Sequence, residues 1–264
     1  MRSLCTAFVA VVAAFAPGAA PQPAAQGRTG QQSSQPASAK AAAPIDLTGQ
    51  WVSVVTEDWR WRMVTPPKGD YASIPITPAA KQVADRWDPA RDEANGEQCK
   101  SYGAAAIMRV PGRLRITWQD DNTLKVETDA GTQTRLLHFD ARTVPAVRPT
   151  WQGLSVAEWE VPTARGRRGE GAPTDARPKF GNLKVVTTHM RSGYLRKNGV
   201  PYSADAILTE YWDVYTARNR DQWLVITTSV IDPSYLQQPW LTTPNFKREP
   251  EGSKWDPTPC STRW

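Results

Sequence analysis

Apolar and polar residues alternate with a period of two along much of the chain between Trp51 and about Ile231. Because successive side chains of a β-strand point to opposite faces, this alternation predicts strands with one buried and one solvated face. The pattern is clearest in residues 113–139, where three alternating segments are separated by short polar junctions at 120–122 and 129–131. Such junctions are typical of tight turns, so this region is predicted to be a three-stranded meander.

Further strands are predicted after the meander. They occupy residues 154–161, 182–190, 206–215 and 222–231, with a last extended piece at 240–247. Together with the strand that begins at Trp51, these segments give about eight strands. Eight is the number at which a closed barrel can hold one small ligand or be filled by its own side chains.

A helical insertion is predicted between the first strand and the meander. Thr77 can cap a helix that has Pro78 at its first position and continues to Trp87. A second short helix is predicted for residues 88–96, where Gly96 ends it. The predicted fold is therefore mainly β, an antiparallel barrel of about eight strands with a short helical insertion after strand one that forms a lid or a flank.

The N-terminal segment follows a different pattern. Arg2 precedes an unbroken run of apolar and small residues, Leu4–Ala16, and residues 1–20 are typical of a cleaved signal peptide. The run is too short to span a bilayer, which needs about 20 residues. Residues 21–44 have almost nothing to bury and are predicted to be a disordered Ala/Gln/Ser/Pro linker. Residues 45–264 then form a single β-barrel domain in the periplasm or outside the cell.

The net charge of the folded part is small. Residues 1–45 hold three of the 32 basic residues and none of the 26 acidic ones, so the remainder carries +3 rather than the +6 of the whole chain. This excess is too weak for the electrostatic footprint of a nucleic-acid-binding protein. We therefore expect a small-molecule partner, no nucleic acid and no membrane span; the sequence sets no oligomeric state.

Cysteine usage predicts one disulfide. Once Cys5 is assigned to the signal peptide, Cys99 and Cys260 remain, and an even pair in an exported chain is typical of a disulfide bond. The alternative is two free or metal-binding thiols, but no Cys-x-x-Cys motif or nearby His supports it. The chain has only two His, which excludes a zinc site of three imidazoles, and no metal or cofactor is expected.

Residues 46–51, Asp-Leu-Thr-Gly-Gln-Trp, resemble the Gly-x-Trp signature that opens the first strand of lipocalins and related calycin barrels. In that family the Trp closes the base of the barrel, and the Gly permits a close approach of the backbone. The signature stands where the predicted linker ends and the strands begin. The resemblance implies a lipocalin-like barrel, although a helical insertion after the first strand is not typical of that family.

A second resemblance covers the region from Trp118 to Cys260, which looks like an uncharacterised family of exported bacterial proteins. It implies export and fold but no activity. The residues that carry it are Gly153-x-Ser155-x-x-x-Trp159-Glu160, Leu183-x-Val185-x-Thr187 and Asn198-Gly199-x-Pro201-x-Ser203.

Candidate catalytic residues are His189, Tyr202 and Glu210. His189 and Tyr202 lie in or beside a dense polar and aromatic loop, and polar loops at a barrel mouth commonly carry function. Glu210 shares a strand face with Leu208 and Trp212. If that face is inward, the carboxylate lies inside the barrel and needs a partner such as Arg135 or His189; if it is outward, Glu210 is an ordinary surface acid.

Candidate ligand-binding residues come from several segments. Residues 59–62 alternate Trp and Arg, so a strand would place Arg60 and Arg62 on one face, where they hold an anion if inward or solvate the surface if outward. The full set of candidates is Arg60, Arg62, Arg135, Trp61, Tyr194, Arg196 and Tyr211.

These features support two main functional hypotheses. The first is an exported lipocalin-like barrel that binds a small apolar or aromatic ligand in its cavity. The alternative is a cofactor-free barrel enzyme, a lyase, isomerase or hydrolase, with His189 or Glu210 as general base and Tyr202 or Tyr211 as acid. The enzyme hypothesis requires these groups to converge in one pocket. A third hypothesis is an envelope interaction protein whose barrel is filled by side chains.

Overall fold

The structure is a computed structural model that describes residues 37–140, 142, 144, 148–161 and 181–262. The predicted signal peptide and residues 21–36 of the predicted linker lie outside the described residues. Residues 39–42, at the end of the predicted linker, form the short helix α1 (Ala39–Ala42), which begins after the N-cap Ser38. The backbone N–H of Lys40 donates to the carbonyl of Asp121, so α1 is tied to the turn between two barrel strands.

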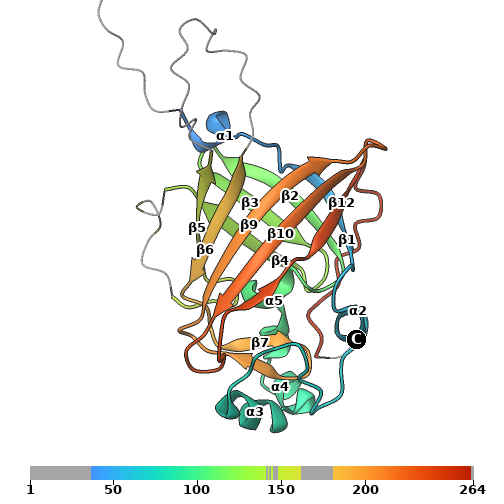
Figure 1. Ribbon diagram of the computed structural model, residues 1–264, viewed down its shortest axis with the longest axis vertical. Coiled ribbons are helices and arrows are strands. Elements are labelled where there is room, and N and C mark those ends of the chain that lie inside the picture. Colours follow the sequence, from blue (N-terminus) through green and yellow to red (C-terminus); the bar gives the residue numbers. More distant parts are fainter. Residues whose placement is uncertain (1–36, 141, 143, 145–147, 162–180, 263–264) are drawn as a thin grey trace, which may run out of the picture. The chain divides into compact units, whose positions relative to one another are not determined.

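Nine strands of the described chain hydrogen-bond in a closed ring (Figure 1). In ring order they are β1 (Gly49–Val54), β2 (Arg113–Asp120), β3 (Thr123–Thr128), β4 (Gln133–His138), β5 (Leu154–Glu160), β6 (Asn182–Thr188), β9 (Ile207–Thr216), β10 (Gln222–Ile231) and β12 (Asn245–Glu249), which pairs with β1. The short β11 (Trp240–Thr242) precedes β12 along the same edge of β10. The predicted closed barrel is confirmed.

Two details of the predicted barrel are corrected. The last extended segment pairs with both β10 and β1, so it adds a ninth strand and closes the ring. The barrel is also mixed rather than purely antiparallel, because β4 and β5 pair in parallel through Leu137↔Ser155 and His138↔Val156. β4 ends at His138 and β5 begins at Leu154, and the two strands run in the same direction.

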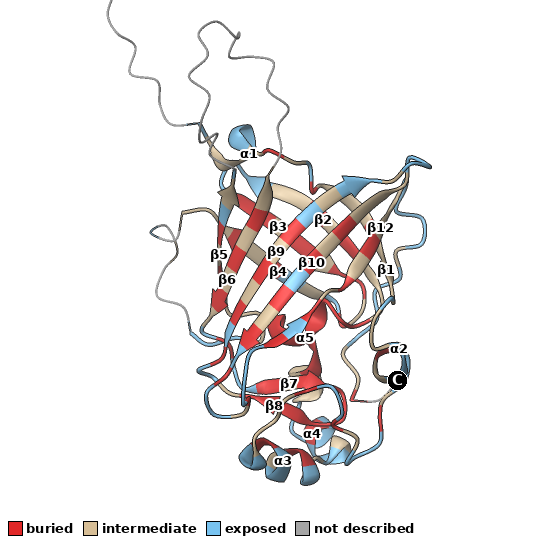
Figure 2. Ribbon diagram, in the orientation of Figure 1, coloured by how far each residue is buried: buried red, intermediate tan, exposed pale blue. Residues whose placement is uncertain are grey.

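Alternating side chains fill the barrel. In β9, Leu208, Glu210 and Trp212 are buried, whereas the residues between them are half-buried or exposed, as the red and paler bands along the strand show (Figure 2). Trp212 packs in one hydrophobic cluster with the fully buried Trp51 and Phe246. The period-two pattern of the sequence therefore identifies the inward face of this strand.

The lower end of the barrel in Figure 1 is covered by a cap. We use this name for α2 (Trp59–Arg62), α3 (Pro78–Asp85), α4 (Pro89–Ala94), the 3₁₀ helix η1 (Gln98–Tyr102), α5 (Ala104–Ile107) and the hairpin β7 (Gly193–Arg196) and β8 (Val200–Tyr202). Thr77 caps α3 by accepting from the N–H of Ala80, and Asp88 caps α4, as the sequence predicts. All four residues of α5 are buried at the mouth of the barrel.

The strand predicted for residues 59–62 is wrong. These residues form one helical turn, so Arg60 and Arg62 do not share a face: the Arg60 side chain is 66% exposed, whereas Arg62 is buried. The alternation of two large aromatic and two cationic residues imitates a strand, but four residues fit one turn of helix equally well.

The predicted disulfide between Cys99 and Cys260 is confirmed. It joins η1 to the C-terminal segment across 161 positions of sequence. Since η1 belongs to the cap, the disulfide fixes the last described residues beside it. None of the described helices is long and apolar enough to cross a membrane.

Candidate ligand-binding site

A pocket of about 280 Å³ lies within the cap, between α3, α4, η1 and the β7–β8 hairpin. Its walls carry four aromatic side chains, Trp87, Tyr194, Tyr202 and Tyr235. Three cations, Arg86, Arg91 and Lys100, also line it, and none of the described carboxylates does. We call this cavity the tyrosine pocket. Its volume approaches the 300–1,000 Å³ typical of small-molecule sites.

Tyr202 is the most unusual residue of the tyrosine pocket. Its side chain is fully buried, yet its hydroxyl has no hydrogen-bond partner among the described residues. A Cβ atom at Gly103 or Gly193 would collide with that hydroxyl, so two glycines make the space in which it lies. Burial raises the pKa of Tyr202, and the hydroxyl therefore stays protonated as a hydrogen-bond donor. A buried donor without a partner calls for an explanation, and a ligand in the pocket that Tyr202 lines would supply one.

Tyr194 is held in place by a buried network on the cap side of the pocket. Its hydroxyl donates to Asp92 Oδ2 at 2.8 Å, and Lys100 Nζ donates to Asp92 Oδ1 at 2.9 Å. Lys100 also lies 5.4 Å from the centre of the Tyr194 ring and pairs with Glu97. Burial and the bond to Asp92 raise the pKa of Tyr194 to about 12. The network fixes one aromatic wall of the pocket and the cation beside it.

The other two cations lie at the surface. Arg86 and Arg91 are exposed, and neither forms an ion pair within the described part of the chain. Burial lowers the pKa of Lys100, but its hydrogen bonds to Glu97 and Asp92 outweigh that effect and the net pKa is raised. Lys100 is thus paired with two carboxylates, whereas the guanidinium groups of Arg86 and Arg91, which form no ion pair among the described residues, favour an anion at the pocket.

Inside the barrel, Arg135 and Glu210 form an ion pair. Arg135 Nη1 donates to Glu210 Oε1 at 3.2 Å and Nη2 donates to Oε2 at 2.7 Å, and both side chains are only 1% exposed. Nη2 also reaches the hydroxyls of Ser155 and Thr187, at 3.4 and 3.3 Å. Of the two alternatives for Glu210, the inward one is realised, with Arg135 as the partner.

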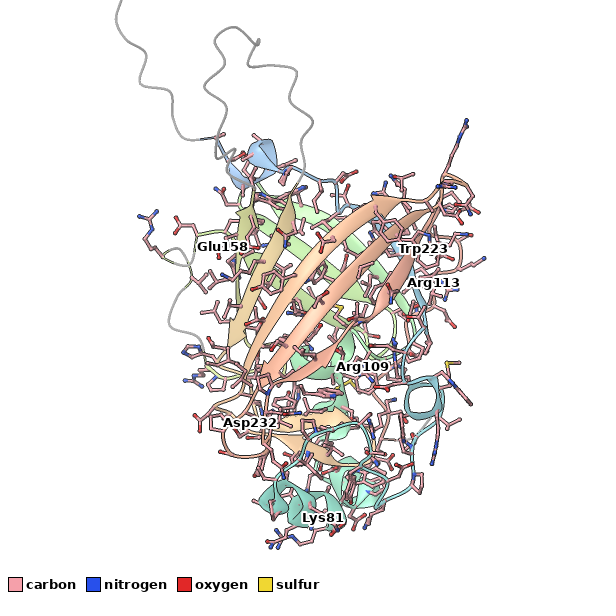
Figure 3. All side chains as sticks on the ribbon, in the orientation of Figure 1. Lys81, Arg109, Arg113, Glu158, Trp223 and Asp232 are labelled. Atoms are coloured by element: carbon pink, nitrogen blue, oxygen red, sulfur yellow. A yellow bond between two sulfur atoms is a disulfide. The ribbon has the colours of Figure 1, made fainter. Side chains whose placement is uncertain are left out.

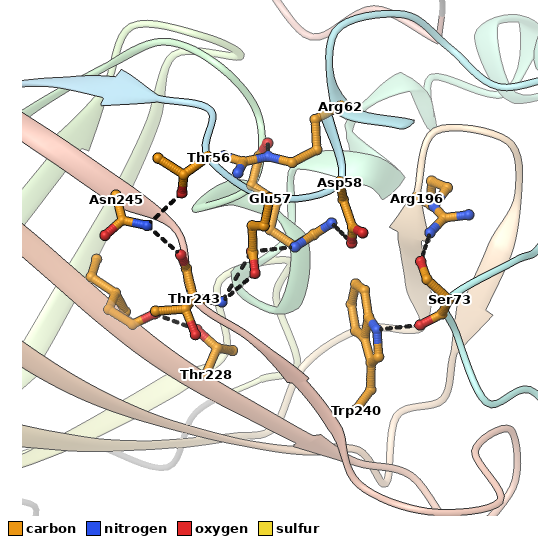
Figure 4. Close-up of polar contacts among 12 residues, drawn as sticks. Thr56, Glu57, Asp58, Arg62, Ser73, Arg196, Thr228, Trp240, Thr243 and Asn245 are labelled. Carbon is orange, nitrogen blue, oxygen red and sulfur yellow. Dashed lines mark hydrogen bonds and ion pairs between the residues drawn. The ribbon is translucent and has the colours of Figure 1, made fainter. Parts of the chain in front are cut away.

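A second, smaller cavity of about 30 Å³ lies where the cap meets the barrel. Trp61, Arg62 and Arg196, three of the predicted ligand-binding residues, line it together. Arg109 and Lys197 complete its cationic lining. Figure 3 shows Arg109 near the junction of barrel and cap, and Figure 4 shows the polar contacts around Arg62 and Arg196.

His189 lies apart from both cavities. It lines a shallow pocket of about 380 Å³ beyond β6, next to Asp205 and Ile207. Its side chain is exposed, its Nδ1 is 2.8 Å from the hydroxyl of Thr188, and its φ of 56° is unusual for a residue other than glycine. Such backbone strain is common at functional sites, but no acid or base of the predicted set shares this pocket.

The structure thus brings together some predicted residues and separates others. Tyr194 and Tyr202 share the tyrosine pocket. The three candidate catalytic residues lie in three different environments: the shallow pocket, the tyrosine pocket and the barrel interior. Of the remaining candidates, Arg60 pairs with Asp70 at the surface, and Tyr211 lies on the outer face of β9.

Several site residues were missed by the sequence analysis. Trp87 and Lys100 line the tyrosine pocket, and Arg109 and Lys197 line the smaller cavity. In the sequence, Trp87 marks only the end of a predicted helix. Lys100 follows Cys99, so the predicted disulfide is the one sequence signal near Lys100. Arg109 follows an apolar run, Ala104–Met108, and a cation after such a run is a weak but readable signal of a buried charge.

Among the described residues, no group of three or more His, Cys, Asp or Glu side chains could hold a metal ion. No model of a known protein family matches this chain. No curated protein is similar to it at a significant level.

Proposed function

We propose that this chain is an exported small-molecule-binding protein on a lipocalin-like barrel, and that its ligand is an aromatic or otherwise flat apolar molecule that carries an anionic group. The ligand binds in the tyrosine pocket of the cap. The observation that carries the proposal is Tyr202, which lines a ligand-sized pocket and whose hydroxyl is buried without a hydrogen-bond partner among the described residues.

The lipocalin-like part of the proposal is supported by the surroundings of Trp51. The guanidinium of Arg248 lies 4.9 Å from the centre of the Trp51 ring and hydrogen-bonds the carbonyl of Thr48. Gly49 has a φ of 121°, and a Cβ there would lie 3.3 Å from Arg248 Nη2. The Gly-x-Trp sequence thus provides the close approach that lets an arginine cover the tryptophan, which agrees with the role of this signature in calycin barrels.

Export is supported by the sequence of residues 1–20 and by the disulfide. A bond between Cys99 and Cys260 persists in oxidising compartments such as the periplasm and the extracellular medium. The N-terminal pattern of one cation, an apolar run and small residues is that of a cleaved signal peptide. The proposal therefore places the mature protein outside the cytoplasm.

The tyrosine pocket suits the ligand better than the barrel interior does. The interior is occupied by large buried side chains such as Trp51, Trp212 and Phe246. It also contains the Arg135–Glu210 pair, whose separation by an apolar ligand would leave two buried charges uncompensated. The tyrosine pocket needs no such rearrangement.

The chemistry of the pocket selects the ligand class. Aromatic faces bind flat apolar groups, while the Tyr202 hydroxyl supplies a directed hydrogen bond. Arg86 and Arg91, which form no ion pair within the described part of the chain, provide positive charge beside the pocket, which attracts an anion and raises its association rate. A carboxylate, sulfonate or phosphate on an aromatic ring satisfies both requirements.

A fluorescence titration with two matched dyes tests this proposal. 8-Anilinonaphthalene-1-sulfonate carries an aromatic body and an anion, and 1-anilinonaphthalene has nearly the same body without the anion. We expect the sulfonate to bind in a one-to-one complex and at least tenfold more tightly than the neutral dye. Tyr202→Phe should weaken sulfonate binding several-fold, whereas Tyr211→Phe, on the outer face of β9, should not.

Two outcomes would contradict the proposal. One is equal affinity of the two dyes for the wild-type protein, which would show that the cations do not contribute. The other is equal sulfonate affinity of the Tyr202→Phe and Tyr211→Phe variants, which would place the dye elsewhere.

A further inference from the structure

The small cavity at the junction of cap and barrel is lined by charged groups from three separate parts of the chain. Arg62 is the last residue of α2, Arg109 follows α5, and Arg196 and Lys197 lie at the end of β7. All four residues are buried. Such a concentration of buried cations is costly unless negative charge compensates it, because each ion loses its hydration.

Arg109 is paired with two carboxylates. Its Nη1 donates to Glu57 Oε1 and its Nη2 donates to Asp58 Oδ2, each at 2.7 Å. Both oxygens of Glu57 also accept the backbone N–H of Thr243, at 3.0 and 2.9 Å (Figure 4). The two carboxylates are therefore already engaged by Arg109 and the backbone.

Arg62 and Arg196 have no ion pair within the described part of the chain. Arg196 Nη2 donates to the Ser73 hydroxyl at 2.9 Å, and its Nη1 reaches the Asp70 carbonyl at 3.4 Å, so its contacts are neutral acceptors. Arg62 donates through Nε to the Arg109 carbonyl at 2.9 Å. Its two terminal nitrogens, Nη1 and Nη2, are buried and have no hydrogen-bond partner among the described residues.

The electrostatics agree with this geometry. Burial, and next the charge of Arg109, lower the pKa of Arg62 to about 10, despite the opposing effect of Glu57 and Asp58. Burial and the charge of Arg109 lower the pKa of Arg196 to about 10 as well. Both groups stay protonated at neutral pH, so the cavity holds positive charge that its own carboxylates do not balance.

We propose that this cavity is a binding site for a small monovalent anion of halide size, which Arg62 holds through Nη1 and Nη2. A volume of about 30 Å³ accommodates about two water-sized groups, which is enough for chloride and too little for an aromatic ligand. The anion contacts α2 and compensates the charge of Arg109 and Arg196, so it ties the cap to the mouth of the barrel. The site is separate from the tyrosine pocket and does not depend on the function proposed for it.

The test is thermal unfolding at constant ionic strength, with chloride replaced stepwise by gluconate, an anion too large for the cavity. We expect the wild-type midpoint to rise with chloride concentration. The rise should vanish in Arg62→Met and persist in Arg60→Met, a matched variant on the same helical turn whose side chain is exposed. Sulfonate-dye binding to the tyrosine pocket should be unaffected by Arg62→Met.

Two results would overturn the proposal: a wild-type midpoint that does not distinguish chloride from gluconate, or a chloride dependence that survives Arg62→Met. If Arg62→Met does not fold, crystals of the wild-type protein grown in bromide decide the question. An anomalous bromide peak within hydrogen-bond distance of Arg62 Nη1 or Nη2 supports the site, and its absence there contradicts it.

Discussion

Arg135 on β4 and Glu210 on β9 form a two-point ion pair inside the barrel, in which both terminal nitrogens of the arginine donate to the carboxylate. The two residues are 75 positions apart in sequence and lie on strands that are not neighbours in the ring. The pair therefore links two strands through the interior. The hydroxyls of Ser155 and Thr187, on the strands between them, accept further hydrogen bonds from Nη2, whereas Arg135 Nε is buried without a partner among the described residues.

Removal of one partner should destabilise the protein strongly. Glu210→Gln leaves the buried Arg135 without a counter-charge, and such losses cost about 3–5 kcal/mol. We expect the free energy of unfolding, measured by urea denaturation, to fall by about 3 kcal/mol or more. Glu158→Gln, which breaks the exposed pair with Lys184, should change it by less than about 1 kcal/mol.

The double variant Arg135→Met/Glu210→Leu should recover most of that loss. Replacement of both charges by apolar side chains removes their desolvation cost, and the strand positions already face an apolar core. A double variant as unstable as Glu210→Gln would show that the pair contributes net stability through its hydrogen-bond network.

Tyr202→Phe should not destabilise the ligand-free protein. The substitution removes only a hydroxyl that is buried without a partner among the described residues, and the desolvation of such a group costs about 1–3 kcal/mol. We expect the free energy of unfolding without ligand to stay equal or rise by about 1 kcal/mol. A loss of more than about 1 kcal/mol would mean that the hydroxyl makes a stabilising contact in the free protein.

Loss of the disulfide should lower stability in a reductant-dependent way. The bond between Cys99 and Cys260 closes a long loop, and removal of a native disulfide costs about 2–5 kcal/mol. Cys99→Ser/Cys260→Ser should unfold at a lower urea midpoint than the oxidised wild type. Dithiothreitol should lower the wild-type midpoint to that of the variant and leave the variant midpoint unchanged. A wild-type midpoint that does not change with dithiothreitol would contradict this prediction.

Lys197 should make the protein more stable as the pH rises above 8. Burial lowers its pKa from 10.5 to about 8 in the folded protein, so between these values the unfolded state binds more protons than the folded state. Stability then increases with pH, by about 1–2 kcal/mol up to pH 10. Above pH 10 the raised pKa values of Tyr71 and Tyr194, both about 12, lower the stability, because unfolding releases their protons, whereas the lowered pKa values of Arg62 and Arg196, both about 10, act in the opposite direction.

Urea denaturation of the wild type and Lys197→Met at pH 8, 9 and 10 checks this dependence. The variant should lack the rise between pH 8 and 10. The same rise in both proteins would assign it to another group.

Much of the barrel was predictable because its strands carry their signal locally. Inward and outward residues alternate along β9 and through the meander, and short polar turns separate the meander strands. The parallel pairing of β4 and β5 was not predictable, since it depends on how the chain crosses between residues 139 and 153 and not on either strand. The strands β7 and β8 are four and three residues long, which is too short for the alternation of apolar and polar residues to predict a strand reliably.

The sites were less predictable than the fold, because burial decides their chemistry. Arg60 and Arg62 look equivalent in sequence, but one helical turn exposes the first and buries the second. The smaller cavity joins Arg62, Arg109 and Arg196, residues that are distant in sequence and carry no shared motif. Likewise, Tyr202 was chosen for its polar loop, whereas its importance comes from the two glycines around its hydroxyl.

The most direct test of the central claim is a crystal structure of the protein with 8-anilinonaphthalene-1-sulfonate bound. Our account predicts the aromatic rings of the dye between Trp87 and the pocket tyrosines. It also predicts a hydrogen bond from Tyr202 to the dye and the sulfonate close to Lys100, Arg86 or Arg91. A dye that lies inside the barrel, or anywhere outside the cap while the tyrosine pocket holds none, would contradict it.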